Sequence, residues 1–516
     1  MKKYINIAFM ALAILAFSSC EDFLDKAPID QLGESSFYSN DDELNMAVMA
    51  SYSGLRSMAN DEWRLTEIRS DNARLYIKNT GDAVNVRLRQ LDNFTVSTTH
   101  EENESYWEAA YKGIDNCNVV LENIGVVADE DLKSQLEGEA RFIRAYIYFN
   151  LVRLYGPVFL VTERLSIEEG NSLSRSSVQD VYDLIESDLI LAGGAAGSTG
   201  LLPGTYDDSD LGRATSWAAK TLLAKVYLTL NDYASAKTLL TNVKDNSGHG
   251  LLVDDYEGVF DVNNEMNDEI IFAVRYLSGG YGQGSPFSNY FSPRDGTFVP
   301  GRAYSYNTPT NDLIEAYDAE GDNIRKDVVM YDTWIDDSGN ENFVPFVKKY
   351  LSDYENEQDA ENDWIVLRFA DVLLMLAEIE NETSSVADAL PYINEVRDRV
   401  GLDDILEEDV PTQWDMMLAI ENERRLEFAF ENHRYYDLLR TDRLATIMEA
   451  HYNAEIIVST IQEDGTVISE PYYAGAASDM SYLSEGGRQL KEWQYLLPIP
   501  NSVMTVATNA TQNPGY

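Results

Sequence analysis

The sequence predicts a mainly α-helical protein in which pairs of helices form a scaffold, and long loops with a few short strands cover one side. Apolar residues recur at helical spacing in several long segments. Two of these segments repeat the same helix–turn–helix pattern, and a loop-rich stretch lies between them. A chain of 516 residues with 44% hydrophobic residues is long enough to bury a large core. It contains two cysteines, which leaves no disulfide framework on which the fold depends.

Residues 1–19 have the layout of a secretory signal peptide. Two lysines precede an apolar run of 11 residues, 7–17, which is too short to span a bilayer. Two serines lead to Cys20, and cleavage before it leaves a cysteine as the new N-terminus. Acylation there would anchor the protein, because each acyl chain contributes roughly 0.8 kcal/mol per buried CH₂. We expect residues 20–40 to form a lipidated tether. The alternative is an ordinary secretory signal with a coincidental cysteine.

The chain is strongly acidic, with 88 Asp and Glu residues against 39 Lys and Arg residues and a formal net charge of −49. Nucleic-acid affinity comes largely from basic side chains that neutralise phosphates. The charge therefore argues against nucleic acid as a partner and leaves neutral ligands open. An anionic membrane surface would also repel the body of the protein, so the lipid is the expected membrane contact.

Helical patterns dominate beyond the tether, and we expect an N-terminal helical repeat part over residues 41–245. Residues 41–58 open with two aspartates and continue with apolar residues at helical spacing. In residues 129–155, seven apolar residues recur at steps of three and four. Asp129 is placed to cap the start of this helix, and Gly156, followed by proline, ends it.

Residues 213–245 and 366–398 resemble each other at an offset of 153 residues. Each segment contains a helix, a short polar break and a second helix with alanine on the packing face. At this offset Ala224 aligns with Ala377. The arrangement is typical of tetratricopeptide repeats, in which small residues let paired helices approach closely. The two units are too far apart to be neighbours in one tandem array, so a long insert must separate them.

Residues 246–365 form this insert, which is rich in Gly, Pro, Asn, Asp and aromatic residues. They lack helical periodicity for most of their length, and we expect short strands among them, such as residues 269–277. We interpret the insert as the candidate ligand region and residues 366–516 as a C-terminal helical part. The acidic run 254–269 lacks the order of an EF-hand, which favours a solvated loop over a calcium site.

One stretch of the insert, residues 276–306, has eight aromatic residues among 31, with six glycines and three prolines. Loops of this kind lie on the surface, where aromatic rings stay in contact with water unless they pack against other side chains or bind a ligand. A ring offers an apolar face to the C–H side of a sugar, while neighbouring polar groups pair with its hydroxyls. The alternative is that the rings fill a satellite core under the loop. The ligand-binding candidates from this stretch are Tyr281, Tyr290, Phe291, Arg294, Tyr304 and Tyr306.

A second candidate for ligand binding is the polar loop at residues 66–85. Arg69, Asp71, Asn72 and Tyr76 lie close together in this loop. Their side chains carry groups that hydrogen-bond a sugar. Adjacent Asp and Asn residues also make turns, however, which favours the structural interpretation of this loop.

The sequence shows no recognisable catalytic, metal or cofactor site. Glu423, Glu427 and Glu431 recur at steps of four on one predicted helical face, with arginines nearby. Paired carboxylates can serve a glycosidase, but three on an exposed face beside arginines are typical of a structural ion network. The four histidines do not share ligand spacing, and the common nucleophile, phosphate-binding and zinc motifs are missing. We expect Cys117 to be a small buried side chain in a helix.

Several segments together resemble the SusD/RagB family of Bacteroidota surface lipoproteins, and the likeness runs from Cys20 to Tyr516. The matching segments are CEDFLDKAPID at the start of the mature chain, SYWEAAYKGIDNCNVVLENI (105–124), EARFIRAYIYFNLVRLYGPV (139–158), LRFADVLLMLAEIENE (367–382), ENERRLEFAFENHRYYDLLR (421–440) and YLLPIPNSVMTVATNATQNPGY (495–516). The resemblance implies a SusD-like fold over residues 41–516, with embedded tetratricopeptide-like units. It also implies a non-enzymatic outer-membrane protein that faces outwards as a lid over a SusC-like TonB-dependent transporter. Such proteins bind nutrients, most often oligosaccharides or polysaccharide segments, and pass them to the transporter.

The favoured hypothesis is a lipid-anchored, cell-surface capture protein for oligosaccharide or polysaccharide, with a glycan and the transporter as its partners. The second hypothesis keeps the anchor and the transporter, but the ligand is a peptide or another nutrient. The third is a glycoside hydrolase, suggested only by the abundant carboxylates. The fourth is an interaction scaffold in which the aromatic loop is wholly buried. The favoured hypothesis involves no cofactor, no metal and no catalytic residue, and the sequence does not identify the glycan.

Overall fold

The computed structural model describes residues 38–75, 83–195, 197–294, 297–336, 339, 341–342, 344–453, 457–461, 467–471 and 490–516. Within these residues the protein is mainly α-helical, which confirms the predicted fold class. The signal segment, Cys20 and Tyr76 lie outside the described residues. No helix among the described residues is both long enough and apolar enough to cross a membrane.

The helices account for most of the ordered structure. They are α3 (Asp41–Leu65), α4 (Ala83–Asp92), α5 (Glu101–Asn123), α6 (Glu130–Tyr155), α7 (Ile167–Asn171), α8 (Val178–Gly193), α9 (Ser216–Thr229), α10 (Tyr233–Asn246), α11 (Phe287–Phe291), α12 (Asn311–Glu320), α13 (Asn323–Val329), α14 (Phe369–Thr383), α15 (Val386–Asp398), α16 (Gln413–Glu427), α17 (Arg434–Arg440), α18 (Leu444–Asn453) and α19 (Asn501–Val506).

The strands are short and, in the described part of the chain, pair only two at a time. They are β1 (Ala73–Arg74), β2 (Ile270–Val274), β3 (Thr308–Pro309), β4 (Met330–Tyr331), β5 (Trp334–Ile335), β6 (Glu341–Asn342), β7 (Phe346–Val347), β8 (Trp364–Arg368), β9 (Ile457–Ile461) and β10 (Val467–Pro471). The antiparallel pairs are β1–β3, β2–β8, β4–β7, β5–β6 and β9–β10. The helices, not these ribbons, therefore determine the architecture.

The long N-terminal helices α3 and α6 show how local sequence sets helix ends. α3 begins after Asn40, whose side-chain oxygen accepts a hydrogen bond from the backbone N–H of Glu43 at 3.1 Å. It runs to Leu65, beyond the segment 41–58 that the sequence predicts, because buried residues continue to recur along it. α6 begins after Asp129, which caps it as predicted, and ends at Gly156, whose φ of 70° suits glycine.

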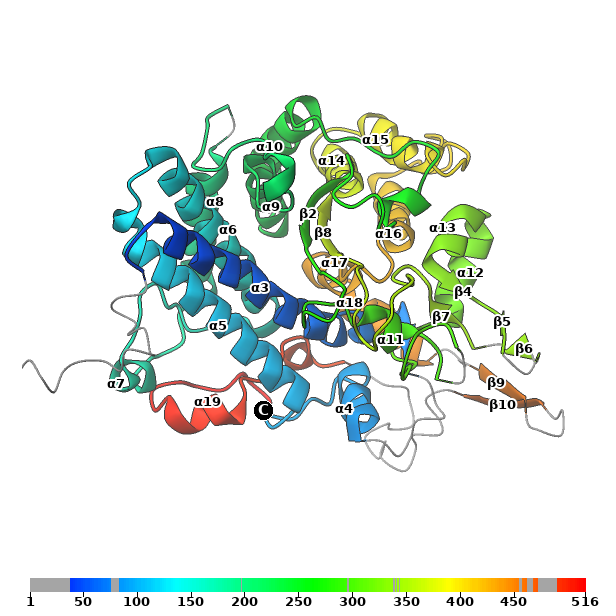
Figure 1. Cartoon of the computed structure of the whole chain (residues 1–516). Coiled ribbons are helices and arrows are strands. Elements are labelled where there is room, and N and C mark those ends of the chain that lie inside the picture. The colour runs from blue at the N-terminus through cyan, green and yellow to red at the C-terminus, as the bar shows by residue number, and fades with distance from the viewer. Residues whose placement is uncertain are drawn as a thin grey trace, which may run out of the picture.

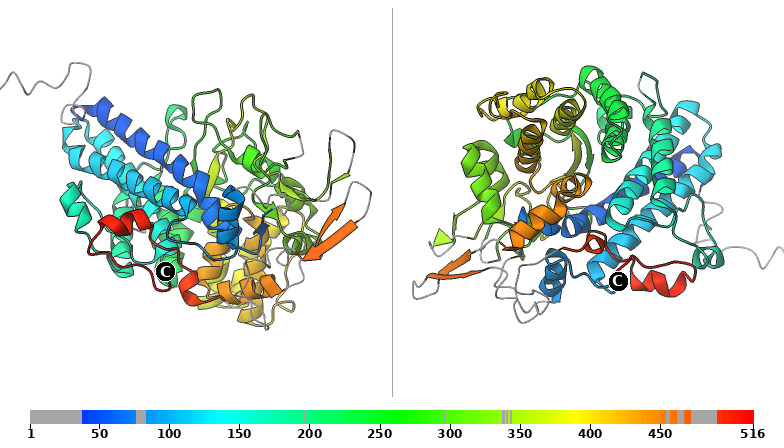
Figure 2. Two further views of the ribbon diagram at one scale, coloured as in Figure 1. Left: turned by 90° about the horizontal axis from the view of Figure 1, so that it is seen from below. Right: turned by 180° about the vertical axis from the view of Figure 1, so that it is seen from behind.

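The two predicted helix pairs are confirmed. α9 packs on α10, and α14 packs on α15. The aligned residues Ala224 and Ala377 are both fully buried, which lets the helices approach closely. α10 also packs against α14, so units that are far apart in the sequence are neighbours in space. Figure 1 shows an arc of helices from α6 and α8 through α9 and α10 to α14, α15 and α16, and Figure 2 shows it from behind.

The loop-rich insert contains more helix than the sequence predicts. α12 and α13 lie within it, each begun by a side-chain cap, from Thr310 and Asp322 respectively. Gly321, with a φ of 70°, separates them, so each helix is too short for its periodicity to stand out. β2 confirms the strand predicted within residues 269–277. It pairs with β8, which leads directly into α14 and so joins the insert to the C-terminal helices.

The C-terminal segment returns to the N-terminal helices. The backbone N–H of Leu497 donates to the carbonyl oxygen of Leu154 near the end of α6, at 2.8 Å. Asn513 is buried, and its side-chain amide donates to the carbonyl oxygens of Tyr155 and Leu497 at 2.9 and 2.7 Å. The last residues of the chain therefore support a helix that begins more than three hundred residues earlier.

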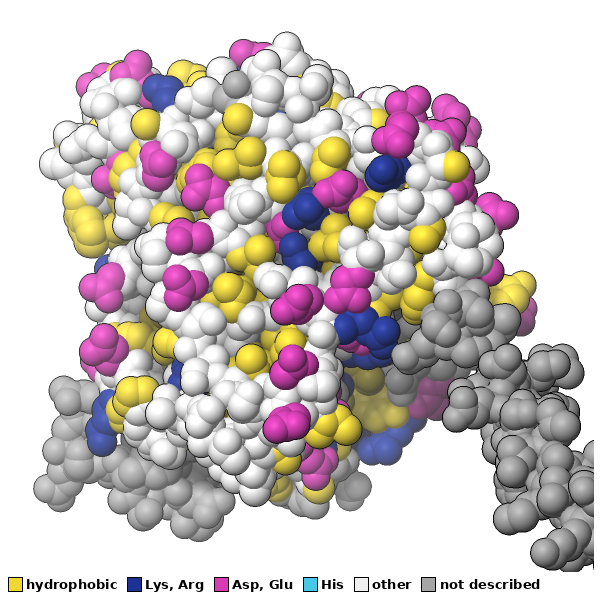
Figure 3. All heavy atoms as spheres, turned by 90° about the vertical axis from the view of Figure 1, so that its left-hand side faces the viewer, with side chains coloured by type: hydrophobic (Ala, Val, Ile, Leu, Met, Phe, Trp, Pro, Cys, Tyr) yellow, Lys and Arg dark blue, Asp and Glu magenta, His cyan; other side chains and the backbone are white. Residues whose placement is uncertain are grey.

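One large hydrophobic core runs through the N-terminal helices, the two helix pairs and the β2–β8 ribbon. Cys117 lies in it, fully buried and free as predicted, and burial raises the pKa of its thiol to about 12. The outer surface shows the acidic balance of the sequence. Figure 3 shows Asp and Glu side chains scattered over the face that is at the left of Figure 1, with fewer Lys and Arg side chains.

Candidate functional site

An aromatic cluster lies where the last turns of α3 meet the predicted aromatic stretch. Trp63 is fully buried at its centre. The Trp63 ring meets Phe291 edge-on at 5.1 Å between ring centroids, stacks with Tyr306 at 6.1 Å and is tilted against Tyr290 at 6.0 Å. Aromatic rings attract one another at such separations beyond the area they bury. These four rings together with Tyr304 are called the Trp63 cluster below.

Two rings of the Trp63 cluster, Tyr290 and Tyr304, are only partly buried and reach the surface. They meet edge-to-face with centroids 5.7 Å apart. The hydroxyl of Tyr304 donates to a carboxylate oxygen of Glu357 at 3.1 Å and accepts from the side-chain amide of Gln358 at 3.2 Å. Burial raises the pKa of Tyr304, and the hydrogen bond to Glu357 raises it further. The hydroxyl therefore stays protonated and acts as the donor in this hydrogen bond.

Guanidinium groups border the two surface rings. Arg64 lies over both Trp63 and Tyr290, 5.1 Å from each ring centroid. Arg302 is exposed and lies 4.9 Å from the centroid of Tyr304. Ring faces attract cations, which positions the guanidinium groups at the edge of the cluster. The result is a pair of ring faces beside planar hydrogen-bonding groups, an arrangement that suits recognition of a ligand with both apolar and hydroxyl surfaces.

Asn289 is a buried side chain that the sequence analysis did not single out, and it holds the cluster's loops together. Its amide donates to the carbonyl oxygens of Pro300 and Arg302, both at 2.9 Å. Its side-chain oxygen accepts from the hydroxyl of Tyr354 at 2.8 Å and from the backbone N–H of Gln358 at 2.6 Å. No local sequence signal marks Asn289, because its partners lie between 11 and 69 residues away.

The structure brings four of the predicted aromatic residues together and places the others differently. Tyr290, Phe291, Tyr304 and Tyr306 all belong to the Trp63 cluster. Arg294 lies beside it, and its backbone N–H donates to the Ser305 hydroxyl at 2.8 Å. Tyr281 is 71% exposed in a separate loop, closed by a hydrogen bond from the N–H of Leu277 to the carbonyl oxygen of Gln283 at 2.9 Å. The stretch therefore contains both packed rings and rings open to a ligand.

The three described residues predicted in the polar loop, Arg69, Asp71 and Asn72, are buried and hold other parts of the chain. Arg69 is fully buried and donates to two backbone carbonyl oxygens of the C-terminal segment. Asp71 accepts two hydrogen bonds from Arg434, both at 2.8 Å. The side-chain oxygen of Asn72 accepts from Arg425 at 2.8 Å. These contacts agree with the structural interpretation of the loop, and ligand binding by these residues stays a prediction.

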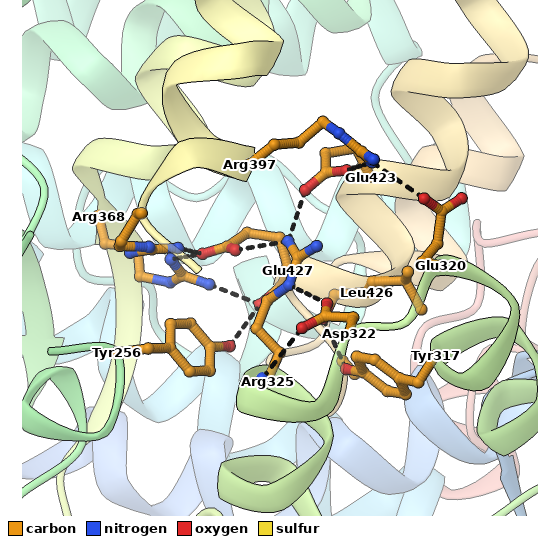
Figure 4. A network of polar contacts seen from close by, with 12 residues as sticks. Tyr256, Tyr317, Glu320, Asp322, Arg325, Arg368, Arg397, Glu423, Leu426 and Glu427 are labelled. Atoms are coloured by element: carbon orange, nitrogen blue, oxygen red, sulfur yellow. Dashed lines mark hydrogen bonds and ion pairs between the residues drawn. The ribbon is translucent and has the colours of Figure 1, made fainter. Parts of the chain in front are cut away.

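Glu423, Glu427 and Glu431 form a buried ion network, not the exposed helical face that the sequence predicts. Figure 4 shows Glu423 and Glu427 within it. All three are at most 3% exposed, and Glu431 lies in the turn after α16 has ended. Their burial is possible because basic residues compensate their charge. These basic residues come from β8, from α13, and from the segments that follow β7 and α15. Burial raises the pKa of Glu427, but the surrounding arginines outweigh it and hold that pKa well below its ordinary value. A glycosidase acid needs the opposite shift.

Among the described residues, no group of three or more His, Cys, Asp or Glu side chains is arranged to hold a metal ion. The Trp63 cluster and the side chains that border it present aromatic faces, hydroxyls, an amide, a carboxylate and guanidinium groups. This donor set can bind and orient a ligand by stacking and hydrogen bonding.

Comparisons with known proteins match both ends of the chain. A family model described as the SusD family matches residues 335–516, and one described as "starch-binding associating with outer membrane" matches residues 22–228. A SusD-like protein of Formosa agariphila is 27% identical over 86% of this chain and 91% of its own. A SusD-like protein of Bacteroides ovatus is also 27% identical, over 84% of this chain and 82% of its own.

Solved structures show the same architecture. A laminarin-binding SusD-like protein superposes with a TM-score of 0.73 at 26% identity, over 93% of this chain and 100% of its own. Surface glycan-binding protein A of Bacteroides thetaiotaomicron, in complex with laminarihexaose, has a TM-score of 0.71 at 20% identity, over 92% and 99% of the two chains. The second likeness concerns the fold alone. With the arc of paired helices and the sequence matches at both ends, these comparisons show that the chain belongs to the SusD family.

Proposed function

We propose that this protein is a lipid-anchored protein of the outer-membrane surface. It captures an oligosaccharide or polysaccharide at the Trp63 cluster and delivers it to a SusC-like TonB-dependent transporter. The observation that carries the proposal is the pair of partly exposed tyrosine rings bordered by hydrogen-bonding side chains. The laminarin-binding relative supports a glycan as the ligand class, and the laminarihexaose complex shows that this fold accommodates one.

The chemistry of the cluster matches a sugar ring. Tyr290 and Tyr304 offer apolar ring faces to the C–H side of a pyranose. Glu357 and Gln358 meet at the Tyr304 hydroxyl, and Arg302 lies over the same ring, so groups of both donor and acceptor type are at hand for sugar hydroxyls. The site is open to water and gains little per contact, which predicts modest affinity, roughly micromolar to millimolar. Modest affinity also suits a protein that must release its ligand to a transporter.

Replacing Tyr290 or Tyr304 by alanine is expected to weaken glycan binding at least about tenfold, equal to about 1.4 kcal/mol, because each removes a stacking face. Calorimetry against a panel of neutral and acidic oligosaccharides that includes laminarihexaose measures this loss. Tyr304→Phe keeps the ring and removes only the hydroxyl, so it is expected to lose less than Tyr304→Ala.

The matched control is Trp414→Ala, which removes another surface aromatic ring, 55% exposed on α16. It is expected to bind glycans like the unaltered protein. Binding that survives both tyrosine substitutions would contradict the site. Peptide binding without any glycan binding would favour the peptide alternative. Shortened oligosaccharides after incubation with purified protein would favour a hydrolase, whereas we expect the oligosaccharide to be recovered intact.

Replacing Cys20 by alanine is expected to abolish lipidation and release the protein from the membrane, since the acyl chains are the proposed anchor. Metabolic labelling with palmitate and fractionation of cells measure the two effects. The unaltered protein should carry the label, and protease added to whole cells should degrade it. A Cys20→Ala protein that still fractionates with the outer membrane would contradict the anchor.

A further inference from the structure

A pocket of about 430 Å³ lies beside α3 on the N-terminal side of the Trp63 cluster. One wall is a face of α3 that includes Met49, Tyr52 and Arg56. The other walls are residues 209–213, in the connection between α8 and α9, and residues 273–277 at and after the end of β2. Described residues from three separate parts of the chain therefore build this pocket, and none of them belongs to the Trp63 cluster.

Arg56 is the unusual group in this pocket. It is partly buried, and its only side-chain hydrogen bond within the described residues goes from Nη1 to the carbonyl oxygen of Arg275 at 3.2 Å. No described carboxylate forms an ion pair with it, in a chain that has more than two acidic residues for each basic one. Burial lowers the pKa of Arg56, as expected of a cation that loses water without gaining a counter-charge.

The two other arginines of the pocket already have carboxylate partners. Arg213 is paired with Glu139 at 3.1 Å and with Asp210 at 2.7 Å. Arg275 is paired with Glu265 and Asp363. Asp210, the one carboxylate among the described residues that line the pocket, is thus engaged by Arg213. Among the described residues that line the pocket, Arg56 is therefore the arginine without a carboxylate partner, and a guanidinium binds a carboxylate through two parallel hydrogen bonds.

The remaining surface of the pocket is apolar enough to hold the body of a sugar. Met49, Leu211 and Leu277 are 43%, 49% and 45% exposed at the pocket. Leu277 and Gln283 line the pocket, and they also close the loop that carries the exposed ring of Tyr281. An aromatic face therefore lies in a loop at the edge of the pocket. Apolar walls with one unpaired guanidinium suit a ligand that has C–H faces and a single carboxylate.

The pocket and the Trp63 cluster are neighbours along one side of α3. Arg56, Asn60 and Arg64 recur at steps of four, which places Arg56 about 12 Å from Arg64 along the helix at 1.5 Å per residue. The hydroxyl of Tyr276 donates to the side-chain oxygen of Asn60 at 2.7 Å and fixes the wall between the two sites. A single extended ligand of a few sugar units is long enough to contact both.

We infer that this pocket is a subsite for an acidic sugar, a uronic acid whose carboxylate is bound by Arg56 while neighbouring sugar units lie on the Trp63 cluster. The inference rests on the proposed glycan-binding function and adds the substrate class, a glycan that contains uronic acid. It assigns Arg56 the role of distinguishing an acid from its neutral counterpart.

The test is calorimetry with purified full-length lipoprotein in detergent. The probes are short oligomers of galacturonic, guluronic and glucuronic acid, each compared with its own methyl ester, which has the same rings without the charge. We expect at least one acid to bind tenfold or more tightly than its ester, with a preference that falls as salt is added. Arg56→Gln is expected to remove the preference by weakening the acid about tenfold and leaving the ester within twofold.

Arg56→Gln keeps a donor for the carbonyl oxygen of Arg275 and breaks no ion pair, so the variant is expected to fold, with an unchanged thermal midpoint. Arg56→Lys should restore part of the preference. Arg89→Gln, at a partly buried arginine on α4 outside the pocket, should leave it intact.

Equal binding of acid and ester, or a preference that survives Arg56→Gln, would overturn the inference. If neutral glycans bind through Tyr290 and Tyr304 but no acid is preferred, the inference fails and the proposed function stands. If no glycan binds at all, both fail. Binding of a triglutamate peptide through Arg56, without uronate binding, would overturn the inference in favour of an acidic peptide.

Discussion

Replacing Glu427 by glutamine is expected to lower the free energy of unfolding by about 3–5 kcal/mol, because it removes the one carboxylate that three buried arginines share. One carboxylate oxygen of Glu427 accepts from Arg368 and Arg399, and the other accepts from Arg325 at 2.9 Å. These four side chains are at most 1% exposed. A glutamine fits the same space, but it carries no charge and has one acceptor oxygen in place of two, so the substitution removes the charge and at least one of these hydrogen bonds.

The network stabilises the fold because it joins elements that are far apart in the sequence. Arg325 belongs to α13, Arg368 ends β8 and Arg399 follows α15, and all three meet Glu427 at the end of α16. Figure 4 shows Arg325 and Arg368 beside Glu427. Urea denaturation of the purified variant measures the loss. The matched control is Asp115→Asn, which makes the same chemical change in an exposed pair with Lys112.

The Lys112–Asp115 pair is 71% and 45% exposed, with 3.7 Å between the two charged atoms. Solvent screens such a pair, so Asp115→Asn is expected to cost less than about 1 kcal/mol. The contrast between the two variants is the prediction. If the Glu427 and Asp115 variants lose similar amounts, the buried network does not carry the stability that its geometry indicates.

The elements that the sequence predicts well are those whose signal is local. α6 has apolar residues at helical steps and a cap at each end, all within its own segment, so its bounds follow from the sequence. The two helix pairs repeat one pattern, which makes them visible without any knowledge of their contacts. That α10 packs against α14 could not be predicted, because this contact depends on how the long insert folds between them.

The candidate site was predicted in part. Four of the five rings of the Trp63 cluster lie in the aromatic stretch, but Trp63 belongs to α3. Trp63, the centre of the cluster, was missed because the helical pattern was followed only over residues 41–58. A signal was present, since Leu55, Ala59 and Trp63 continue the helical spacing and are all buried. Which rings are buried and which reach the surface depends on packing between α3 and residues more than two hundred positions later, and no local pattern records that.

The buried carboxylates were misjudged for a related physical reason. A glutamate is usually exposed, because burying its charge is costly unless partners compensate it. The partners of Glu427 that compensate it lie 28, 59 and 102 residues away in the sequence. Burial of a charged residue is therefore a property of the assembled fold, and sequence spacing alone indicates only that arginines are available nearby.

The Glu67 carboxyl is expected to reduce stability as pH rises from about 4.5 to about 8, and Glu67→Gln is expected to remove this contribution. Glu67 is 1% exposed, and burial raises the pKa of its carboxyl to about 8. One oxygen accepts from the backbone N–H of Asn432 at 2.5 Å, whereas the other has no hydrogen-bond partner among the described residues. The native state therefore holds a proton that the unfolded chain releases near pH 4.5.

The sign of the effect follows from proton linkage. Between the two pKa values the native state binds more protons than the unfolded state, so each pH unit in that window removes up to about 1.4 kcal/mol from stability. Below pH 4.5 both states are protonated, and above pH 8 the penalty is constant. Glutamine mimics the protonated acid at every pH, so the advantage of Glu67→Gln should grow from near zero at pH 4.5 to a few kcal/mol at pH 9.

Urea midpoints of both proteins at pH 5, 7 and 9 measure this divergence. Glu130→Gln, at a glutamate whose side chain is 81% exposed on α6, is the matched control, and its midpoint should differ from that of the wild type by the same amount at all three values. Parallel pH profiles for wild type and Glu67→Gln would mean that Glu67 is ionised in the native state, with a compensating cation close to it. The unpartnered oxygen argues against that arrangement, because an ionised carboxylate so deeply buried needs hydrogen-bond donors at both oxygens.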